Sequence, residues 1–189
     1  MLIDDDIDAC IMTLKKGGLI LYPTDTVWGI GCDAQNEEAV SKIYALKNRN
    51  EQKSMIILVA EESEILNYSS RENHIIFDYI KGVEKPTTVI YEDAKNLAKN
   101  LLAPDGSVGI RIVKDKFCKQ LIKSFGKPIV STSSNVSGYP PPTIFSDVDI
   151  KIKDGVDYIV RHRQDDSTIA LPSTVIRLSA NDIISILRR

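Results

Sequence analysis

The chain contains 189 residues, of which 43% are hydrophobic and 26% charged, and its formal net charge is −2 at pH 7. This length and composition indicate one globular domain, which we place at residues 1–189. A weakly acidic chain is not a general nucleic-acid binder, although a basic face on it could still hold RNA.

The cysteines and the N-terminal residues indicate the cellular setting. Cys10, Cys32 and Cys118 are odd in number and far apart, which argues against a disulfide framework or a zinc knuckle. The acidic start of the chain lacks the order of a signal peptide, and no apolar run reaches the roughly 20 residues that span a membrane. We therefore predict a reduced, cytoplasmic setting and no membrane association.

Hydrophobic periodicity gives the elements in chain order. Helical spacing predicts helices at 4–16, 37–47, 63–66, 72–81, 94–101 and 116–125. Apolar or β-branched runs predict strands at 19–22, 55–60, 87–91, 107–113, 128–132, 157–160, 173–178 and 183–187. Helices and strands alternate early and strands cluster late. This order predicts an α/β (α+β) fold with a mixed sheet and helices packed on it.

The first candidate site follows strand 19–22. Thr24, Asp25 and Thr26 stand at the end of this strand, where ligands bind in α/β sheets. The next helix ends in a basic cluster: residues 42–53 carry four cations against Glu51, a local net charge of +3. Fixed cations beside hydroxyls suit a phosphate or a carboxylate. Taken alone, the cluster is better explained as a solvated, positively charged end of the helix.

The second candidate site follows strand 128–132. Six of the seven residues at 131–137 carry a hydroxyl or an amide, which suits phosphate, ribose or a base edge. The alternative is a serine-rich loop that caps the next element. The run Pro140–Pro142 fits a stiff loop wall better than a polyproline ligand for a partner domain.

Several catalytic classes lack their residues. The two histidines, His74 and His162, have no plausible nucleophile nearby in the sequence, so Ser-His and Cys-His catalysis are poor candidates. No P-loop motif is present, and Gly29 and Gly31 lack the third glycine of the dinucleotide fingerprint.

Five motifs in order carry a resemblance. PTDTVWGIGCDA, KIYALKNRNEQK, VGIR, STSSNVSG and PSTVI resemble the YrdC-like family of threonylcarbamoyl-AMP synthases, from about Ile11 to Arg188. Lys47-x-Arg49 and Ser133-x-Asn135 match its KxR and SxN signature. Departures fall on walls and turns: Trp28 stands where relatives usually have Tyr, and residues 84–88 replace a Pro-Gly-Pro-x-Thr turn.

The resemblance implies a function and a set of site residues. Such enzymes join L-threonine, bicarbonate and ATP into threonylcarbamoyl-AMP and pyrophosphate, and downstream proteins transfer the threonylcarbamoyl group to tRNA. The implied sheet is twisted and has a positively charged concave face. Catalytic roles fall to Lys47 and Arg49. The implied ATP contacts are Arg49, Lys53, Ser133, Asn135 and Arg188. The implied threonine contacts are Thr24, Thr26, Trp28, Arg111, Ser131 and Ser173.

The expectations also include one cofactor and two alternative functions. Mg²⁺ is expected to arrive with ATP, held by phosphates and water, so no side chain is predicted as a metal ligand. tRNA itself is a candidate contact. Two alternatives remain at this point: an RNA-binding module that uses the same basic face, and a paralogue of the same fold without synthase activity.

Overall fold

The structure is a computed structural model that describes residues 2–50, 55–70, 74–178 and 184–188. Its strands are β1 (Ile20–Tyr22), β2 (Gly29–Gly31), β3 (Ile56–Val59), β4 (Thr87–Tyr91), β5 (Val108–Ile112), β6 (Ile129–Ser133), β7 (Tyr158–Ile159), β8 (Thr174–Leu178) and β9 (Ile184–Arg188). Within this part of the chain they form one sheet in the order β7-β1-β2-β6-β3-β5-β4-β8-β9.

The sheet is mixed, as the alternation of elements predicted. Strand β7 runs parallel to β1, β3 to β5, and β4 to β8, whereas the remaining neighbours are antiparallel. Strand β6 pairs with β2 on one side and with β3 on the other. The polar C-terminal end of β6 therefore lies in the interior of the sheet, between elements that are distant in sequence.

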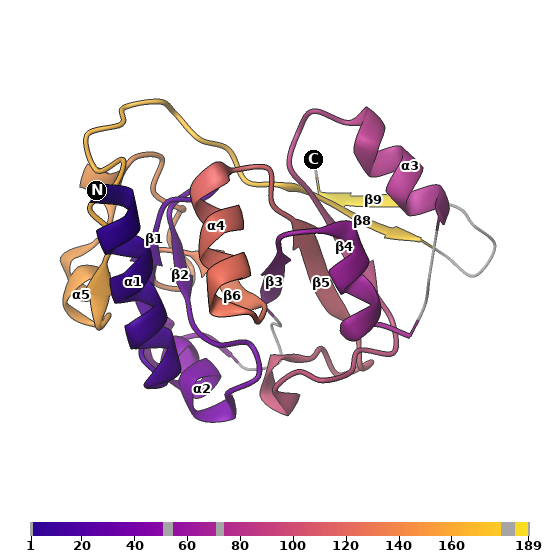
Figure 1. Ribbon diagram of the computed structural model, residues 1–189, viewed down its shortest axis with the longest axis horizontal. Coiled ribbons are helices and arrows are strands. Elements are labelled where there is room, and N and C mark those ends of the chain that lie inside the picture. Colours follow the sequence, from indigo (N-terminus) through magenta and orange to yellow (C-terminus); the bar gives the residue numbers. More distant parts are fainter. Residues whose placement is uncertain (1, 51–54, 71–73, 179–183, 189) are drawn as a thin grey trace.

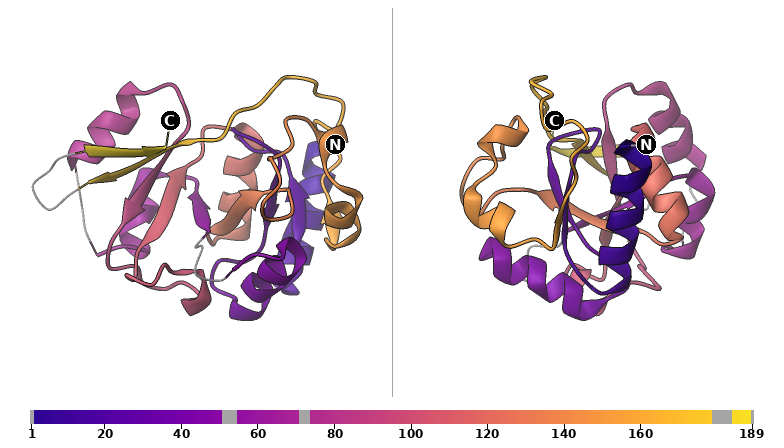
Figure 2. Two further views of the ribbon diagram at one scale, coloured as in Figure 1. Left: turned by 180° about the vertical axis from the view of Figure 1, so that it is seen from behind. Right: turned by 60° about the vertical axis from the view of Figure 1, so that its left-hand side comes forward.

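Helices cover the sheet. They are α1 (Leu2–Lys15), α2 (Glu37–Lys47), α3 (His74–Gly82), α4 (Lys116–Phe125) and α5 (Ile150–Asp154), with 3-10 turns at Glu62–Asn67, Lys99–Leu101 and Phe145–Asp147. Helices α1, α3 and α4 lie on one face of the sheet, and α5 lies on the opposite side (Figures 1 and 2). None of the described helices is both long and apolar enough to cross a membrane.

Helix α4 shows why these segments are helical. Asp115 caps it by accepting a hydrogen bond from the backbone N–H of Cys118, and Gly126 ends it with a left-handed φ of 76°. Between the two caps, the apolar positions follow helical spacing and are buried: Phe117, Cys118, Leu121, Ile122 and Phe125. The helix thus packs one apolar face on the sheet and leaves its lysines in solvent.

One predicted segment differs from the structure, and two short elements of the structure were not predicted. The helix predicted at 94–101 is wrong, because the N–H groups of Ala94, Lys95 and Ala98 bind carbonyls elsewhere in the chain; only a 3-10 turn forms at its end. Strand β2 was not predicted, because a three-residue Gly-Ile-Gly segment shows no periodicity. Helix α5 was missed for the same reason, since five residues do not complete two turns.

The glycine at 31 is required by close packing in the sheet. A Cβ at Gly31 would lie 2.7 Å from Tyr22 Cε1, 2.9 Å from Ile129 Cγ2 and 2.9 Å from the carbonyl oxygen of Val130. These neighbours come from both adjoining strands, so none of them can move without disturbing the sheet.

We expect Gly31→Ala to lower the free energy of unfolding by about 1–3 kcal/mol, because it overpacks a filled interior. Urea unfolding followed by circular dichroism measures this change. Gly82→Ala is the matched control, since no heavy atom lies within 4 Å of its added Cβ. Equal midpoints for the two variants would contradict the packing argument.

Candidate active site

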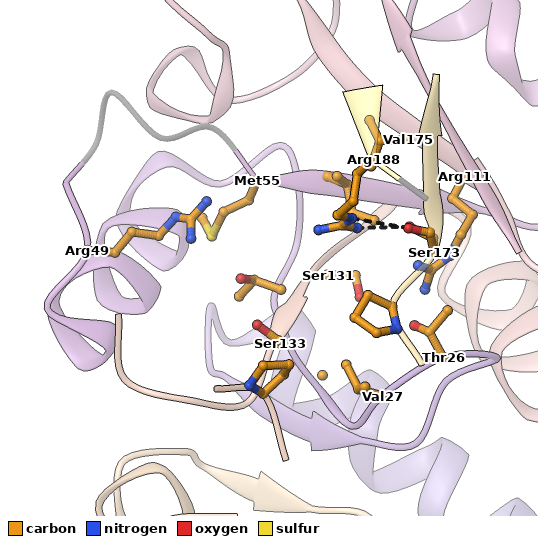
Figure 3. Close-up of a pocket in the computed structure, with 15 residues that line it drawn as sticks. Thr26, Val27, Arg49, Met55, Arg111, Ser131, Ser133, Ser173, Val175 and Arg188 are labelled. Carbon is orange, nitrogen blue, oxygen red and sulfur yellow. Dashed lines mark hydrogen bonds between the residues drawn. The ribbon is translucent and has the colours of Figure 1, made fainter. Parts of the chain in front are cut away.

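A cavity of about 400 Å³ opens over the middle of the sheet (Figure 3). Hydroxyls and arginines supply its polar lining, and no carboxylate belongs to the lining among the residues that the structure describes. The polar lining side chains are Thr26, Arg49, Arg111, Ser131, Thr132, Ser133, Ser173 and Arg188. The size is that of a small-molecule site. A lining of this kind can hold an anion that also carries hydrogen-bond donors.

The turn after β1 orients Thr26. The Thr24 hydroxyl donates to the carbonyl oxygen of Val27 at 2.9 Å and accepts the backbone N–H of Thr26 at 2.9 Å. Because the Thr24 proton is used on Val27, the 2.9 Å contact between the two threonine hydroxyls must be donated by Thr26. The Thr26 oxygen therefore offers the cavity an acceptor, which suits an amine or a hydroxyl donor.

Arg111 brings a buried positive charge to the cavity from β5. Its side chain is 3% exposed, and its Nη2 lies 3.1 Å from Oδ1 of Asp25, which is 7% exposed. Nε and Nη2 of Arg111 have no hydrogen-bond partner in the described structure. Asp25 thus balances the guanidinium charge, while Arg111 borders the cavity as a cation beside which a ligand carboxylate can bind.

Ser173 and Arg188 form the side of the cavity built by β8 and β9. Arg188 donates through Nε to the backbone oxygen of Ser173 at 3.2 Å and through Nη2 to its hydroxyl at 3.3 Å. That hydroxyl also lies 2.9 Å from Oγ1 of Thr88 on β4. Burial and the neighbouring Arg111 lower the pKa of Arg188. Ser173 therefore links a strand of the sheet core to the arginine at the cavity rim.

Arg49 enters from the opposite side, after α2. Asn48 ends the helix with a left-handed φ of 48°, and the N–H of Arg49 binds the carbonyl of Tyr44 at 2.9 Å. This reversal turns Arg49 toward the cavity (Figure 3). Burial lowers the pKa of its guanidinium. The interpretation of this residue as part of a solvated helix end does not fit, since Arg49 is half-buried.

Two residues of the paired motifs do not reach the cavity. Lys47 is 1% exposed, and its Nζ donates to the backbone oxygens of Ser133 and Asn135. The side-chain amide of Asn135 donates to the carbonyls of Val136, at 3.0 Å, and Tyr139, at 2.7 Å. Neither side chain lines the cavity, so the expectation that both face one ligand is wrong in geometry. Lys53 lies outside the described residues.

Trp28 and Thr24 also lie behind the site. Trp28 is 6% exposed and packs on Phe145, with ring centroids 4.7 Å apart. It does not line the cavity, and neither does Thr24, which is 1% exposed. The predicted pocket wall at Trp28 is therefore a core contact, because the turn that aims Thr26 into the cavity leaves the indole beneath the sheet surface.

Sequence reasoning missed the apolar part of the lining. The apolar lining consists of Val27, Met55, Ile56, Val175, Pro141 and Pro172. The stiff loop wall expected from the proline run is present at Pro141. The other apolar residues carry no signal, since their side chains look like ordinary strand positions. Thr132 belongs to the polar run 131–137 that the sequence singled out, although no ligand contact was assigned to it.

The fold and the cavity together define a class: an α/β protein with a cavity over a mixed sheet whose lining suits a small anionic ligand. Comparison of the sequence gives the family. The family described as "Telomere recombination" (Sua5_yciO_yrdC) matches residues 12–189. The chain belongs to this Sua5/YciO/YrdC family, which confirms the resemblance drawn from its motifs.

Relatives agree with this assignment. The threonylcarbamoyl-AMP synthase of Idiomarina loihiensis is 31% identical over 173 residues, which cover 89% of this chain and 91% of that protein. The structure of Pyrococcus abyssi Sua5 with L-threonine matches with a TM-score of 0.84 and 23% identity, covering 96% of this chain but only 53% of that one. Escherichia coli YciO matches with a TM-score of 0.81 and 23% identity, covering 97% and 88%.

We expect the Asp25–Arg111 pair to matter for folding as well as for the site. Asp25→Asn leaves the Arg111 charge buried without compensation, so the free energy of unfolding should fall by about 3–5 kcal/mol. Urea unfolding measures the loss. Glu62→Gln is the control: the Lys81–Glu62 pair spans 3.3 Å with side chains 65% and 37% exposed, and its loss should cost under about 1 kcal/mol. A cost for Asp25→Asn no larger than that of the control would rule out this role.

Proposed function

We propose that the chain is an L-threonylcarbamoyladenylate synthase, a nucleotidyltransferase that makes threonylcarbamoyl-AMP and pyrophosphate from L-threonine, bicarbonate or CO₂, and ATP. One observation carries the proposal: a single cavity joins three arginines to a row of hydroxyls and contains no carboxylate among its described lining residues. The names and coverage of the relatives support it.

The proposed reaction suits a site without a nucleophile. Threonine carbamate forms from the amine and CO₂, and one of its oxygens attacks the α-phosphorus of ATP while pyrophosphate leaves. The attacking oxygen is already anionic, so no strong base is needed. The protein has to align two anions and offset their mutual repulsion, which is the task of fixed positive charge and preorganised donors.

The nucleotide belongs across β6, between the end of α2 and the side of the cavity built by β8 and β9. Arg49 and Arg188 border the cavity and supply positive charge for phosphate oxygens, while the Ser133 hydroxyl can donate to phosphate or ribose. Lys53 remains a predicted phosphate contact. Asn135 acts through the loop that follows Ser133 rather than by touching ATP.

The amino acid belongs on the other side, beside the turn after β1. Arg111 supplies positive charge beside the carboxylate, and the acceptor on Thr26 takes the N–H of threonine, which survives carbamate formation. Ser131 and Ser173 supply further hydroxyls. This arrangement places the carbamate between Thr26 and the nucleotide side, where its oxygen can approach the α-phosphorus.

Magnesium has no resident site in this arrangement. No group of three or more His, Cys, Asp or Glu side chains in the described part of the chain could hold a metal ion, and the cavity offers arginines and hydroxyls rather than carboxylates. These donors do not fit a protein-held Mg²⁺. Mg²⁺ is therefore proposed only as part of the ATP complex, held by phosphates and water.

The product implies further partners. A threonylcarbamoyl adenylate is a reactive mixed anhydride, so its use in tRNA modification requires downstream proteins that take the group to tRNA. Direct contact with tRNA through the arginine-bearing face is part of the same proposal, as is a cytoplasmic location.

The experiment incubates the pure protein with labelled L-threonine, bicarbonate, Mg²⁺ and ATP, and measures pyrophosphate and a new adenylate. Both products should depend on all three substrates. Omission of bicarbonate is the control, because simple threonyl-adenylate formation would survive it. RNA binding without any pyrophosphate release would overturn the proposal in favour of a non-catalytic module.

Arg49→Ala should lower turnover by roughly 10- to 150-fold, the effect of losing one charge-assisted contact to phosphate. The matched control is Arg177→Ala: Arg177 forms an exposed ion pair with Asp105 at 3.2 Å and does not line the cavity. Turnover by the control should equal that of wild type. Unchanged turnover in Arg49→Ala would remove this residue from the site.

Ser173→Ala should raise KM for both substrates, because the same hydroxyl faces the threonine side and holds Arg188 on the nucleotide side. The expected change is about 2- to 12-fold for each. Ser131 has no such hydrogen bond to Arg188, so Ser131→Ala should raise KM for threonine more than KM for ATP. Steady-state kinetics with each substrate varied in turn decide between them. A shift confined to threonine in Ser173→Ala would show that Arg188 needs no such support.

A further inference from the structure

Lys47 is the buried cation that the proposed chemistry leaves unused. It lies in the last turn of α2 and is 1% exposed. Its ammonium group donates to two backbone oxygens, those of Ser133 and Asn135, and no carboxylate pairs with it in the described structure. A buried lysine without a counter-ion is costly. We therefore ask which part of the chain the ammonium group holds in place.

The segment Ser133–Tyr139 folds around this ammonium group. The N–H of Ser137 returns to the backbone oxygen of Lys47 at 2.8 Å. Ser134 donates its hydroxyl to the Trp28 carbonyl at 2.8 Å, and the Asn135 amide closes the far end on Tyr139. Every one of these contacts is to backbone. Their common result is a fixed path for the chain immediately after the cavity-lining Ser133.

We propose that Lys47 is a positioning residue: its ammonium group clamps the Ser133–Tyr139 segment, and an anion bound in the cavity strengthens that clamp. The inference deepens the proposed function, because it rests on that function only for the identity of the anion, a nucleotide phosphate. Lys47 itself touches neither substrate.

The electrostatic coupling follows from what surrounds the amine. Burial, and then the nearby Arg49 charge, lower the pKa of Lys47 to about 7. The segment packed against it contributes only carbonyl dipoles through Ser133 and Asn135, and Arg49 is the one charged group identified as acting on it in the described part of the chain. A phosphate in the cavity brings negative charge near the amine and opposes the repulsion from Arg49, so it raises the pKa of Lys47 and favours the ammonium form.

Proton linkage gives the first consequence. If anion binding raises the pKa of Lys47 from about 7, binding takes up protons between pH 7 and the raised value. ATP affinity must therefore fall as pH rises through that interval, by at most about 10-fold per pH unit. A neutral amine keeps donors for both carbonyls but loses their charge assistance, so the segment loosens without unfolding.

The mutational test uses Lys47→Met and Lys47→Arg. Lys47→Met keeps the length and removes the charge; it should raise KM for ATP by about 10- to 150-fold, with a smaller effect on KM for threonine. Lys47→Arg stays charged at every pH tested, so its ATP affinity should be flat between pH 7 and 8.5 while wild type weakens. Lys42→Met is the control, since Lys42 lies exposed on the same helix and binds the Gly17 carbonyl at 2.8 Å.

The wild-type protein supplies a test that needs no variant. With ¹⁵N- and ¹³C-labelled lysine, one amine should titrate near pH 7 without ligand, and sulfate, which stays fully ionised, should raise that midpoint. No lysine with a lowered midpoint, or a midpoint that ignores a saturating anion, would overturn the inference even if both variants fail to fold.

The outcomes separate this inference from the proposed function. If the protein does not bind ATP but the midpoint of one lysine still responds to sulfate, the synthase proposal is wrong and the clamp proposal stands. If Lys47→Met has full synthase activity and the same KM values as wild type, the clamp proposal is wrong and the synthase proposal stands.

Discussion

The buried guanidinium of Arg111 is the constraint on which the site depends. A charge that is 3% exposed must be balanced, and Asp25 balances it from the turn after β1. Asp25 also accepts the backbone N–H of Lys114 at 3.3 Å, so one carboxylate ties the turn to the end of β5. The neighbouring threonines inherit their orientation from this turn. Stability and ligand geometry are therefore set by the same pair, and the cavity stays positive because the balancing acid lies behind it.

The cavity also depends on distant parts of the chain meeting at one place. Ser131 and Ser133 come from the middle of the sheet, Arg49 from the end of α2, and Arg188 from the last strand. The Ser173 hydroxyl joins Arg188 to Thr88 on β4. A site assembled in this way holds its polar groups through the sheet and its hydrogen bonds, and preorganised donors of this kind are what electrostatic stabilisation of a charged ligand requires.

Sequence patterns predicted most of the regular elements, because buried strands and capped helices carry local periodicity. They could not predict β2, where glycine is demanded by the neighbouring strands, or the absence of a helix at 94–101, where backbone donors are taken by distant carbonyls. For the site, residue type and spacing identified the polar strand ends and the basic cluster that contains Arg49, whereas Arg111, Ser173 and Arg188 were assigned only through the family resemblance. They could not show that Trp28 packs on Phe145 in the core, since position after a turn does not fix the face to which a ring points.

The two paired motifs show how spacing alone misleads at a site. Lys47 and Arg49 are two residues apart, as are Ser133 and Asn135, and both pairs suggest side chains that act together on a ligand. The left-handed Asn48 reverses the chain between the cations, so Lys47 points into the protein and Arg49 into the cavity. Ser133 likewise faces the cavity while the Asn135 amide binds its own loop. The two inward-pointing residues are joined because the ammonium group of Lys47 donates to the backbone oxygen of Asn135. The two outward-pointing residues, Arg49 and Ser133, border the same cavity. Each motif thus contributes one side chain to the lining of the cavity and one to the scaffold that holds that lining in place.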